Sequence, residues 1–134
     1  MNKTLVLIIL CLHFVSCEEE PENRFEISET SSRESDNKLL DELHEEILVL
    51  SNQVTCTNAN EWEITAIGAK ACGGPTGYIA YSSQIDKIDF LDKVNRYTSL
   101  QDFYNQKWGV VSDCMFLTPP KGIECINGFP EFIY

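Results

Sequence analysis

Polar and apolar side chains alternate along Glu61-Trp62-Glu63-Ile64-Thr65-Ala66, and this alternation is the pattern of a half-buried β-strand. A second short run of β-type residues occupies positions 78–81. Between them stands Lys70-Ala71-Cys72-Gly73-Gly74-Pro75-Thr76-Gly77, where three glycines and one proline fall within eight residues. This composition predicts a tight, irregular loop, because glycine reaches backbone conformations that are closed to other residues. The stretch therefore predicts two short strands with a constrained loop between them.

Helical periodicity flanks this stretch on both sides. Before it, apolar residues recur at helical spacing over residues 37–53, and Asp36 or Asn37 can cap the first turn. This amphipathic helix either docks on the domain that follows or offers its leucines to another protein. After the stretch, residues 84–107 show the same periodicity. The two apolar stripes contain Leu39, Leu40, Leu43, Ile47, Leu48 and Leu50 in the first helix, and Phe90, Val94, Tyr97, Tyr104 and Trp108 in the second.

A β-hairpin is predicted near residue 134. Asn127-Gly128 stands between two apolar runs, and this dipeptide favours the tight turns that join antiparallel strands. Pro130 limits the last strand to an edge or irregular position, and Val110-Val111 is predicted to begin a further strand. The simplest packing of these pieces places about two helices against a small antiparallel sheet. Residues 54–134 are therefore predicted to form an α+β domain.

The first residues resemble those of an exported protein. Lys3 precedes an apolar run of about twelve residues, whereas a helix that spans a membrane needs about 20. The length and flanks of this run predict a secretory signal peptide over residues 1–16. The run ends in Phe14-Val15-Ser16-Cys17, which resembles the lipobox of bacterial lipoproteins. That resemblance implies removal of the signal peptide and attachment of fatty acyl chains such as palmitate to Cys17, which would anchor the chain in the membrane. The alternative is an ordinary cleaved signal that happens to end in a cysteine.

An acidic flexible linker is predicted over residues 17–36. Positions 18–36 hold eight acidic residues, two arginines and only two large apolar side chains, too few to offset the entropy cost of ordering the segment. Glu18-Glu19-Glu20, directly after Cys17, resembles the export signal of surface lipoproteins in the Bacteroidota. This resemblance implies a lipoprotein of the outer membrane in the cell envelope, facing either the periplasm or the cell exterior.

Four cysteines follow Cys17 in the sequence: Cys56, Cys72, Cys114 and Cys125. An even number of cysteines in a small exported chain predicts disulfides. Their spacing includes no Cys-x-x-Cys pair, which argues against a zinc site and against a redox dithiol of that type. Three pairings are open. We favour Cys56–Cys72 with Cys114–Cys125, because each bond closes a local loop and is expected to contribute about 3 kcal/mol in the chain-entropy model.

The region from Cys56 onward resembles a group of bacterial exported domains. The resemblance rests on residues 66–75, which include Lys-Ala-Cys-Gly-Gly-Pro, and on Tyr78-Ile79-Ala80-Tyr81-Ser82. It extends to Tyr104-Asn105, Ser112-Asp113-Cys114 and Pro119-Pro120. The resemblance implies an autonomous exported domain that a linker joins to a lipid or another anchor. It carries no catalytic residues over to this chain.

Charge and loop rigidity bear on the partners of the protein. The chain has 21 acidic and 10 basic residues, a formal net charge of −11 that repels phosphate backbones, so no nucleic-acid partner is expected. A disulfide-anchored loop is rigid, and rigid loops bind well because little ordering cost remains on binding. The candidate binding loop comprises Lys70, Gly73, Gly74, Pro75 and Tyr78, with Lys70 as the residue that an inhibitor would offer to a trypsin-like protease.

No set of catalytic residues stands out in the sequence. A cysteine or serine nucleophile needs a nearby base, and His44 is the only histidine after the predicted signal peptide. No pattern marks a metal site or a cofactor site. The sequence therefore favours a membrane-anchored, non-enzymatic binding or accessory module with an envelope protein as its partner. The alternative is a small extracytoplasmic hydrolase or carbohydrate-active domain that uses acidic residues together with the aromatic residues of the domain.

Overall fold

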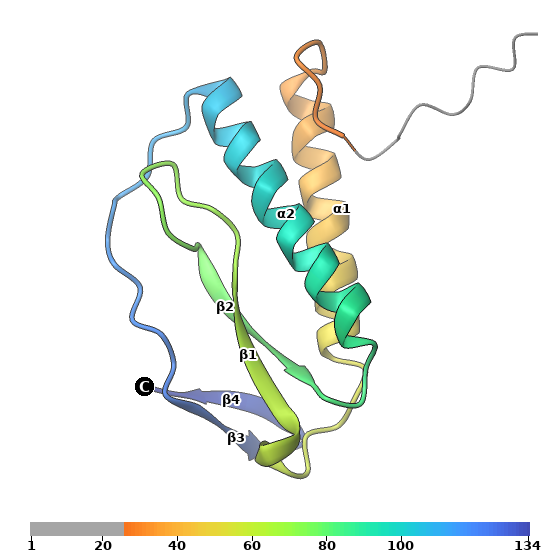
Figure 1. The fold of residues 1–134 in the computed structure, drawn as a ribbon. Coiled ribbons are helices and arrows are strands. Elements are labelled where there is room, and N and C mark those ends of the chain that lie inside the picture. Colours follow the sequence, from red (N-terminus) through yellow and green to blue (C-terminus); the bar gives the residue numbers. More distant parts are fainter. Residues whose placement is uncertain (1–25) are drawn as a thin grey trace, which may run out of the picture.

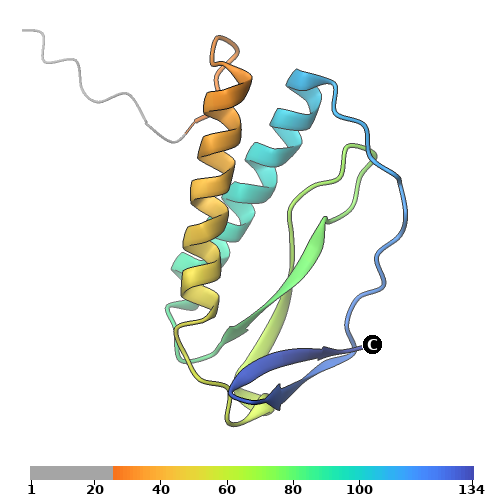
Figure 2. The same cartoon turned by 180° about the vertical axis from the view of Figure 1, so that it is seen from behind.

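The computed structural model describes residues 26–134 of the chain. The predicted signal peptide and Cys17 lie outside the described residues. The elements, in chain order, are α1 (Arg33–Ser51), the 3₁₀ turn η1 (Ala59–Glu61), β1 (Trp62–Ile67), β2 (Gly77–Ser82), α2 (Lys87–Trp108), β3 (Gly122–Ile126) and β4 (Phe129–Ile133). The two helices lie side by side and pack against the hairpin of β1 and β2 (Figures 1 and 2). The predicted α+β class with two disulfides is confirmed.

The strands form two antiparallel hairpins, β1 with β2 and β3 with β4. Asn127 and Gly128 form the turn of the second hairpin with φ angles of 52° and 87°, the left-handed conformations that an Asn-Gly turn requires. Pro130 lies in β4. Among residues 26–134, β3 is the only strand that pairs with β4, so the predicted edge position is confirmed. The strand predicted at Val110-Val111 is wrong. Within the described part of the chain no strand pairs with these residues, and Val111 is 92% exposed.

The start of the fold lies earlier in the chain than the sequence indicated. α1 begins before the predicted residue 37, and the Ser32 side chain caps it. The predicted cap Asp36 instead lies inside the helix and is 2% exposed, because side chains of α2 bind its carboxylate. Ile27 is buried as well, at 7% exposure. The prediction of a flexible acidic linker is therefore wrong for residues 26–36, which belong to the folded unit.

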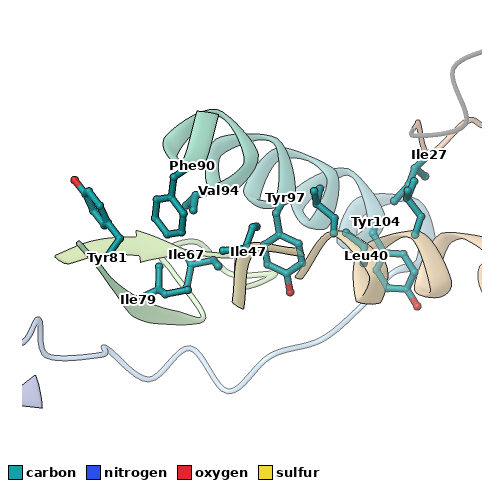
Figure 3. Packing of buried hydrophobic residues seen from close by; sticks show 12 residues of the cluster. Ile27, Leu40, Ile47, Ile67, Ile79, Tyr81, Phe90, Val94, Tyr97 and Tyr104 are labelled. Atoms are coloured by element: carbon teal, nitrogen blue, oxygen red, sulfur yellow. The ribbon is translucent and has the colours of Figure 1, made fainter. Parts of the chain in front are cut away.

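The main core lies between the two helices and the first hairpin. Phe90 of α2 and Ile47 of α1 are both 0% exposed and mark its centre. Figure 3 shows the α2 side chains Phe90, Val94 and Tyr97 pointing toward the other elements. The apolar stripe of α1 thus docks on the domain, which was one of the two alternatives that the sequence left open. The buried cluster contains Ile27, Leu39, Leu40, Leu43, Ile47, Ile67, Ile79, Tyr81, Phe90, Val94, Tyr97 and Tyr104.

A second, smaller core joins the two hairpins. Trp62, Ala80 and Cys56 are its buried members. Partly buried apolar residues of the second hairpin pack against them, and these include Cys125 and Phe132. The second hairpin is therefore attached to the first by apolar packing as well as by a disulfide.

The disulfides join Cys56 to Cys125 and Cys72 to Cys114, so the predicted local pairing is wrong. The second hairpin folds back on the segment before β1, where the Cys56 N–H donates a hydrogen bond to the Gly128 carbonyl oxygen at 2.8 Å. This packing brings Cys56 beside Cys125 and away from Cys72. The bonds span sequence separations of 69 and 42 residues. Loops of these lengths correspond to about 4 kcal/mol for each bond in the chain-entropy model.

Candidate binding surface

The loop between β1 and β2, residues 68–76, is called the glycine loop below, and polar side chains of α2 hold it in place. Gln101 Oε1 accepts a hydrogen bond from the Ala69 N–H at 2.7 Å, and Asn105 Nδ2 donates to the Ala69 carbonyl oxygen at 2.8 Å. Thr98 Oγ1 accepts from the N–H one residue earlier in the loop, at 3.0 Å. The three side chains lie on one face of α2 because they are three and four positions apart. The helix therefore satisfies backbone groups of the loop and fixes its position.

The extended segment 109–121, called the crossing segment below, runs from α2 to β3 and passes the tip of the glycine loop (Figures 1 and 2). Lys70 points toward this segment, and its side chain is 13% exposed. Lys70 Nζ donates hydrogen bonds to Asp113 Oδ1 at 3.1 Å and to the Met115 carbonyl oxygen at 2.7 Å. The hydrogen bond from Lys70 holds the pKa of Asp113 below its ordinary value of 3.8. Lys70 thus supports the crossing segment, and the prediction that it is offered to a protease pocket is wrong.

Further contacts fix the crossing segment along its length. The disulfide joins Cys114 to Cys72 at the tip of the glycine loop. The Cys72 N–H donates to Ser112 Oγ at 3.3 Å. Farther along, the hydroxyl of Tyr78 on β2 donates to the Leu117 carbonyl oxygen at 3.4 Å. The segment has no regular secondary structure, yet it is held by one covalent bond and by hydrogen bonds on both sides of that bond.

Large apolar side chains project from this fixed segment into solvent. Val111 is 92% exposed, Met115 65% and Phe116 84%. Cys114, directly before Met115, has a φ of 49°, a left-handed conformation that is uncommon outside glycine. Exposed apolar residues that gather in one region often mark a binding surface. The crossing segment is therefore the candidate binding surface of the domain.

The residues predicted for the binding loop divide into two groups. Gly73 and Gly74 are exposed at the tip of the glycine loop, with φ angles of 96° and 83° that favour glycine. Lys70, Pro75 and Tyr78 are partly buried, and Lys70 and Tyr78 hold the crossing segment. The predicted loop is thus the support for the apolar surface. The sequence analysis did not identify this apolar surface. The feature that could have marked it is the pair of large apolar residues Met115-Phe116, which stands in a stretch without helical or strand periodicity.

Some of the acidic residues on which the hydrolase alternative could draw line one hollow. Four acidic residues of α1, with Lys93 of α2, line a hollow of about 810 Å³. All four are exposed, so no burial distinguishes a general acid from a general base, as a glycosidase-type pair requires. None of the lining residues is aromatic. They are Asp41, Glu42, Glu45, Glu46, Val49, Leu50 and Lys93.

A second polar cluster joins β1, β2 and α2. Glu63 Oε2 accepts hydrogen bonds from the Tyr81 hydroxyl at 2.8 Å and from Lys87 Nζ at 2.6 Å. The hydrogen bond from Lys87 lowers the pKa of Glu63, and the bond to Glu63 raises the pKa of Lys87. Burial, followed by the bond to Glu63, raises the pKa of Tyr81. Each group is held in the protonation state that it has at neutral pH, so the cluster stabilises structure and is not poised for proton transfer.

The histidine and the aromatic residues considered above for catalysis or sugar binding are packed against other residues of the fold. His44 stacks on Tyr97 with ring centroids 5.2 Å apart. Trp62, Tyr81 and Tyr104 are buried in the two cores, so these aromatic rings present no surface to a sugar. Within residues 26–134, no group of three or more His, Cys, Asp or Glu side chains is arranged to hold a metal ion.

Comparison of the chain with family models, with curated proteins and with solved structures gave no match. The same described part of the chain contains no helix with both the length and the apolar character needed to cross a membrane.

Proposed function

We propose that the chain is an exported lipoprotein of the bacterial outer membrane, anchored through acyl groups at Cys17. Its folded part is a non-enzymatic module that binds an envelope protein through the crossing segment. The anchor rests on the resemblance of Phe14-Val15-Ser16-Cys17 to a lipobox. Two disulfides support export, because such bonds persist in oxidising compartments outside the cytosol.

One observation carries the binding function: the crossing segment is fixed by Cys72–Cys114 and by Lys70, yet it leaves Met115 and Phe116 exposed. Fully burying a side chain of this size contributes roughly 1.5–3 kcal/mol. Because the segment is already ordered, a partner that covers these residues loses little of that energy to the entropy of ordering a loop. The arrangement therefore suits the recognition of an apolar depression on another protein.

Photo-crosslinking in cells tests the binding function. A photoreactive phenylalanine analogue placed at Phe116 is expected to give one discrete adduct with an envelope protein. The matched control carries the analogue at Ile88, which is apolar and 83% exposed at the start of α2 but lies outside the crossing segment. The adduct at position 116 should disappear when Met115→Ser is added. The same adducts at both positions, or none at position 116, would contradict the proposal.

The anchor has its own test. Metabolic labelling with a palmitate analogue is expected to label the wild-type protein, and the label should be lost in Cys17→Ser. Fractionation should place the labelled protein in the outer membrane. A wild-type protein without label, or with label that Cys17→Ser retains, would contradict acylation at this residue.

A further inference from the structure

The second hairpin has one face packed on the fold and one face open to solvent. Side chains alternate between the faces of a strand, so the neighbours of the packed residues Cys125 and Phe132 face outward. Gathered exposed apolar side chains are typical of binding surfaces. The apolar residues of the open face are Ile126 (44% exposed), Phe129 (60%) and Ile133 (43%).

Two acidic residues lie directly opposite each other in the middle of this open face. The register of β3 and β4 pairs Glu124 with Glu131. Like charges at directly opposed cross-strand positions destabilise a hairpin. Within the described part of the chain, no ion pair joins either glutamate to a basic side chain. Within residues 26–134 the two glutamates therefore face each other without a basic partner, and a cation supplied by another protein would relieve their repulsion.

The order of side chains along the open face determines which side chains a partner segment needs in order to fit it. Ile126 and Phe129 form the pair on one side of the two glutamates, and Gly122 and Ile133 form the pair on the other side. Gly122 has no side chain, and the Ile133 side chain reaches to 3.8 Å from where a Cβ of Gly122 would lie, so Ile133 alone supplies the apolar surface of this pair. A partner segment with a positive charge between two apolar side chains matches this order.

A hollow beside β4 extends the open face. Its volume is about 310 Å³, and it lies between β4, β2 and the end of α1. Phe129 and Glu131 line it on the hairpin side, and Asn52 and Tyr78 are among the residues that line it on the other side. The hollow gives a long side chain of a partner a place beside Glu131.

We propose that the open face of the second hairpin binds a segment of another protein in which a lysine or arginine stands between apolar side chains. A charge-assisted hydrogen bond to a carboxylate is about twice as strong as one between neutral groups. The acidic balance of the whole chain, 21 residues against 10, favours a basic partner. The face lies at the end of the molecule away from the start of α1 (Figures 1 and 2). It is a second surface because β3 and β4 form it, whereas the exposed apolar residues Val111, Met115 and Phe116 belong to the crossing segment that precedes β3.

Selection from a random-peptide phage library against the oxidised protein tests the chemistry of the partner. The enriched sequences should contain lysine or arginine with apolar neighbours. Synthetic versions of these peptides should bind the double variant Glu124→Gln/Glu131→Gln about tenfold more weakly, a loss of about 1.4 kcal/mol. Binding should be unchanged in the control Asp41→Asn/Glu45→Gln, which removes two exposed charges from α1. The proposal is overturned by a lack of enrichment, by peptides without a basic residue, or by equal binding to the double variant.

Two measurements on the free protein complete the test. The double variant Glu124→Gln/Glu131→Gln lacks the facing charges, so its free energy of unfolding should be slightly higher than that of the wild type. A lower value would contradict the repulsion from which the proposal starts.

Analytical ultracentrifugation of the wild-type protein should show a monomer. A dimer that Phe129→Ser dissociates would show that a second copy covers this face, and would overturn the proposal of a basic partner.

Discussion

Lys107 Nζ lies 2.7 Å from Asp36 Oδ2, and both side chains are buried, at 8% and 2% exposure. The same ammonium group donates hydrogen bonds to the carbonyl oxygens of Ser28 at 2.7 Å and Ser31 at 2.8 Å. Trp108 Nε1 donates to the carboxylate at 2.9 Å. The last turn of α2 therefore holds both the first turn of α1 and the turn that precedes it. This network makes residues 26–36 part of the fold.

We expect Lys107→Met to lower the free energy of unfolding by about 3 kcal/mol, because it leaves the buried Asp36 carboxylate without its cation. Urea denaturation at pH 7 measures the change. The matched control is Lys38→Met, which removes the exposed pair of Lys38 with Glu42, at side-chain exposures of 76% and 57%. This variant should lose less than about 0.5 kcal/mol. Equal decreases in the free energy of unfolding of the two variants would show that the buried ion pair stabilises the fold no more than the exposed one.

The same pair predicts a dependence of stability on pH. Burial raises the pKa of Asp36, but hydrogen bonds from Lys107, Ser31 and Trp108 outweigh burial and hold the pKa below its ordinary value of 3.8. A carboxylate whose pKa is lower in the folded state stabilises the fold above its unfolded pKa, and this contribution is lost as the pH falls from 3.8 through the folded pKa. The difference in stability between wild type and Asp36→Asn should therefore be full at pH 7 and shrink below pH 3.8. Urea titrations across this range measure it, and a difference independent of pH would contradict the assignment.

Periodicity predicted the elements of the fold because it reports which side chains share a face. Phe90 and Val94 recur at helical spacing, and both are buried where α2 meets the first hairpin. Asn127-Gly128 predicted the second hairpin because few residues other than these adopt its left-handed turn. Local patterns of this kind depend on neighbours in sequence, and those neighbours are visible without a structure.

Contacts between residues far apart in the chain could not be predicted from such local patterns. Composition marked Asp36 as part of a solvated linker, because its cation Lys107 lies 71 positions away. The pairing of Cys56 depends on which hairpin packs on the segment before β1, and loop length alone pointed to the wrong partner. The exposed run at Met115 was missed because an irregular segment has no period from which exposure follows.

Peptide mapping checks the corrected disulfides. Trypsin cleaves after Lys70 and Lys121, and also between the other cysteines, so the four cysteines fall in four different peptides. Digestion without reduction should give one linked pair with Cys56 and Cys125 and another with Cys72 and Cys114. Unfolding in an alkylating reagent should find no free thiol among the four. A peptide that links Cys114 to Cys125 would contradict the packing of the second hairpin described above.

Gly68 and Gly73 provide a matched pair for testing how the glycine loop is held. Both have left-handed φ angles, of 76° and 96°, so alanine at either position costs about 1–2 kcal/mol in backbone strain. At Gly68 a Cβ would also overlap Thr76 Oγ1 and lie 2.5 Å from Gln101 Oε1, whereas at Gly73 it would meet nothing within 4 Å.

Gly68→Ala should therefore destabilise the protein by about 1–3 kcal/mol more than Gly73→Ala, because the side chains that dock the loop on α2 must move. Urea denaturation measures the difference, and hydrogen exchange should show faster opening of the Ala69 amide only in Gly68→Ala. Equal effects of the two substitutions would mean that the hydrogen bond from Ala69 to Gln101 does not hold the loop. The crossing segment would then lack part of the rigid support on which its role as a binding surface depends.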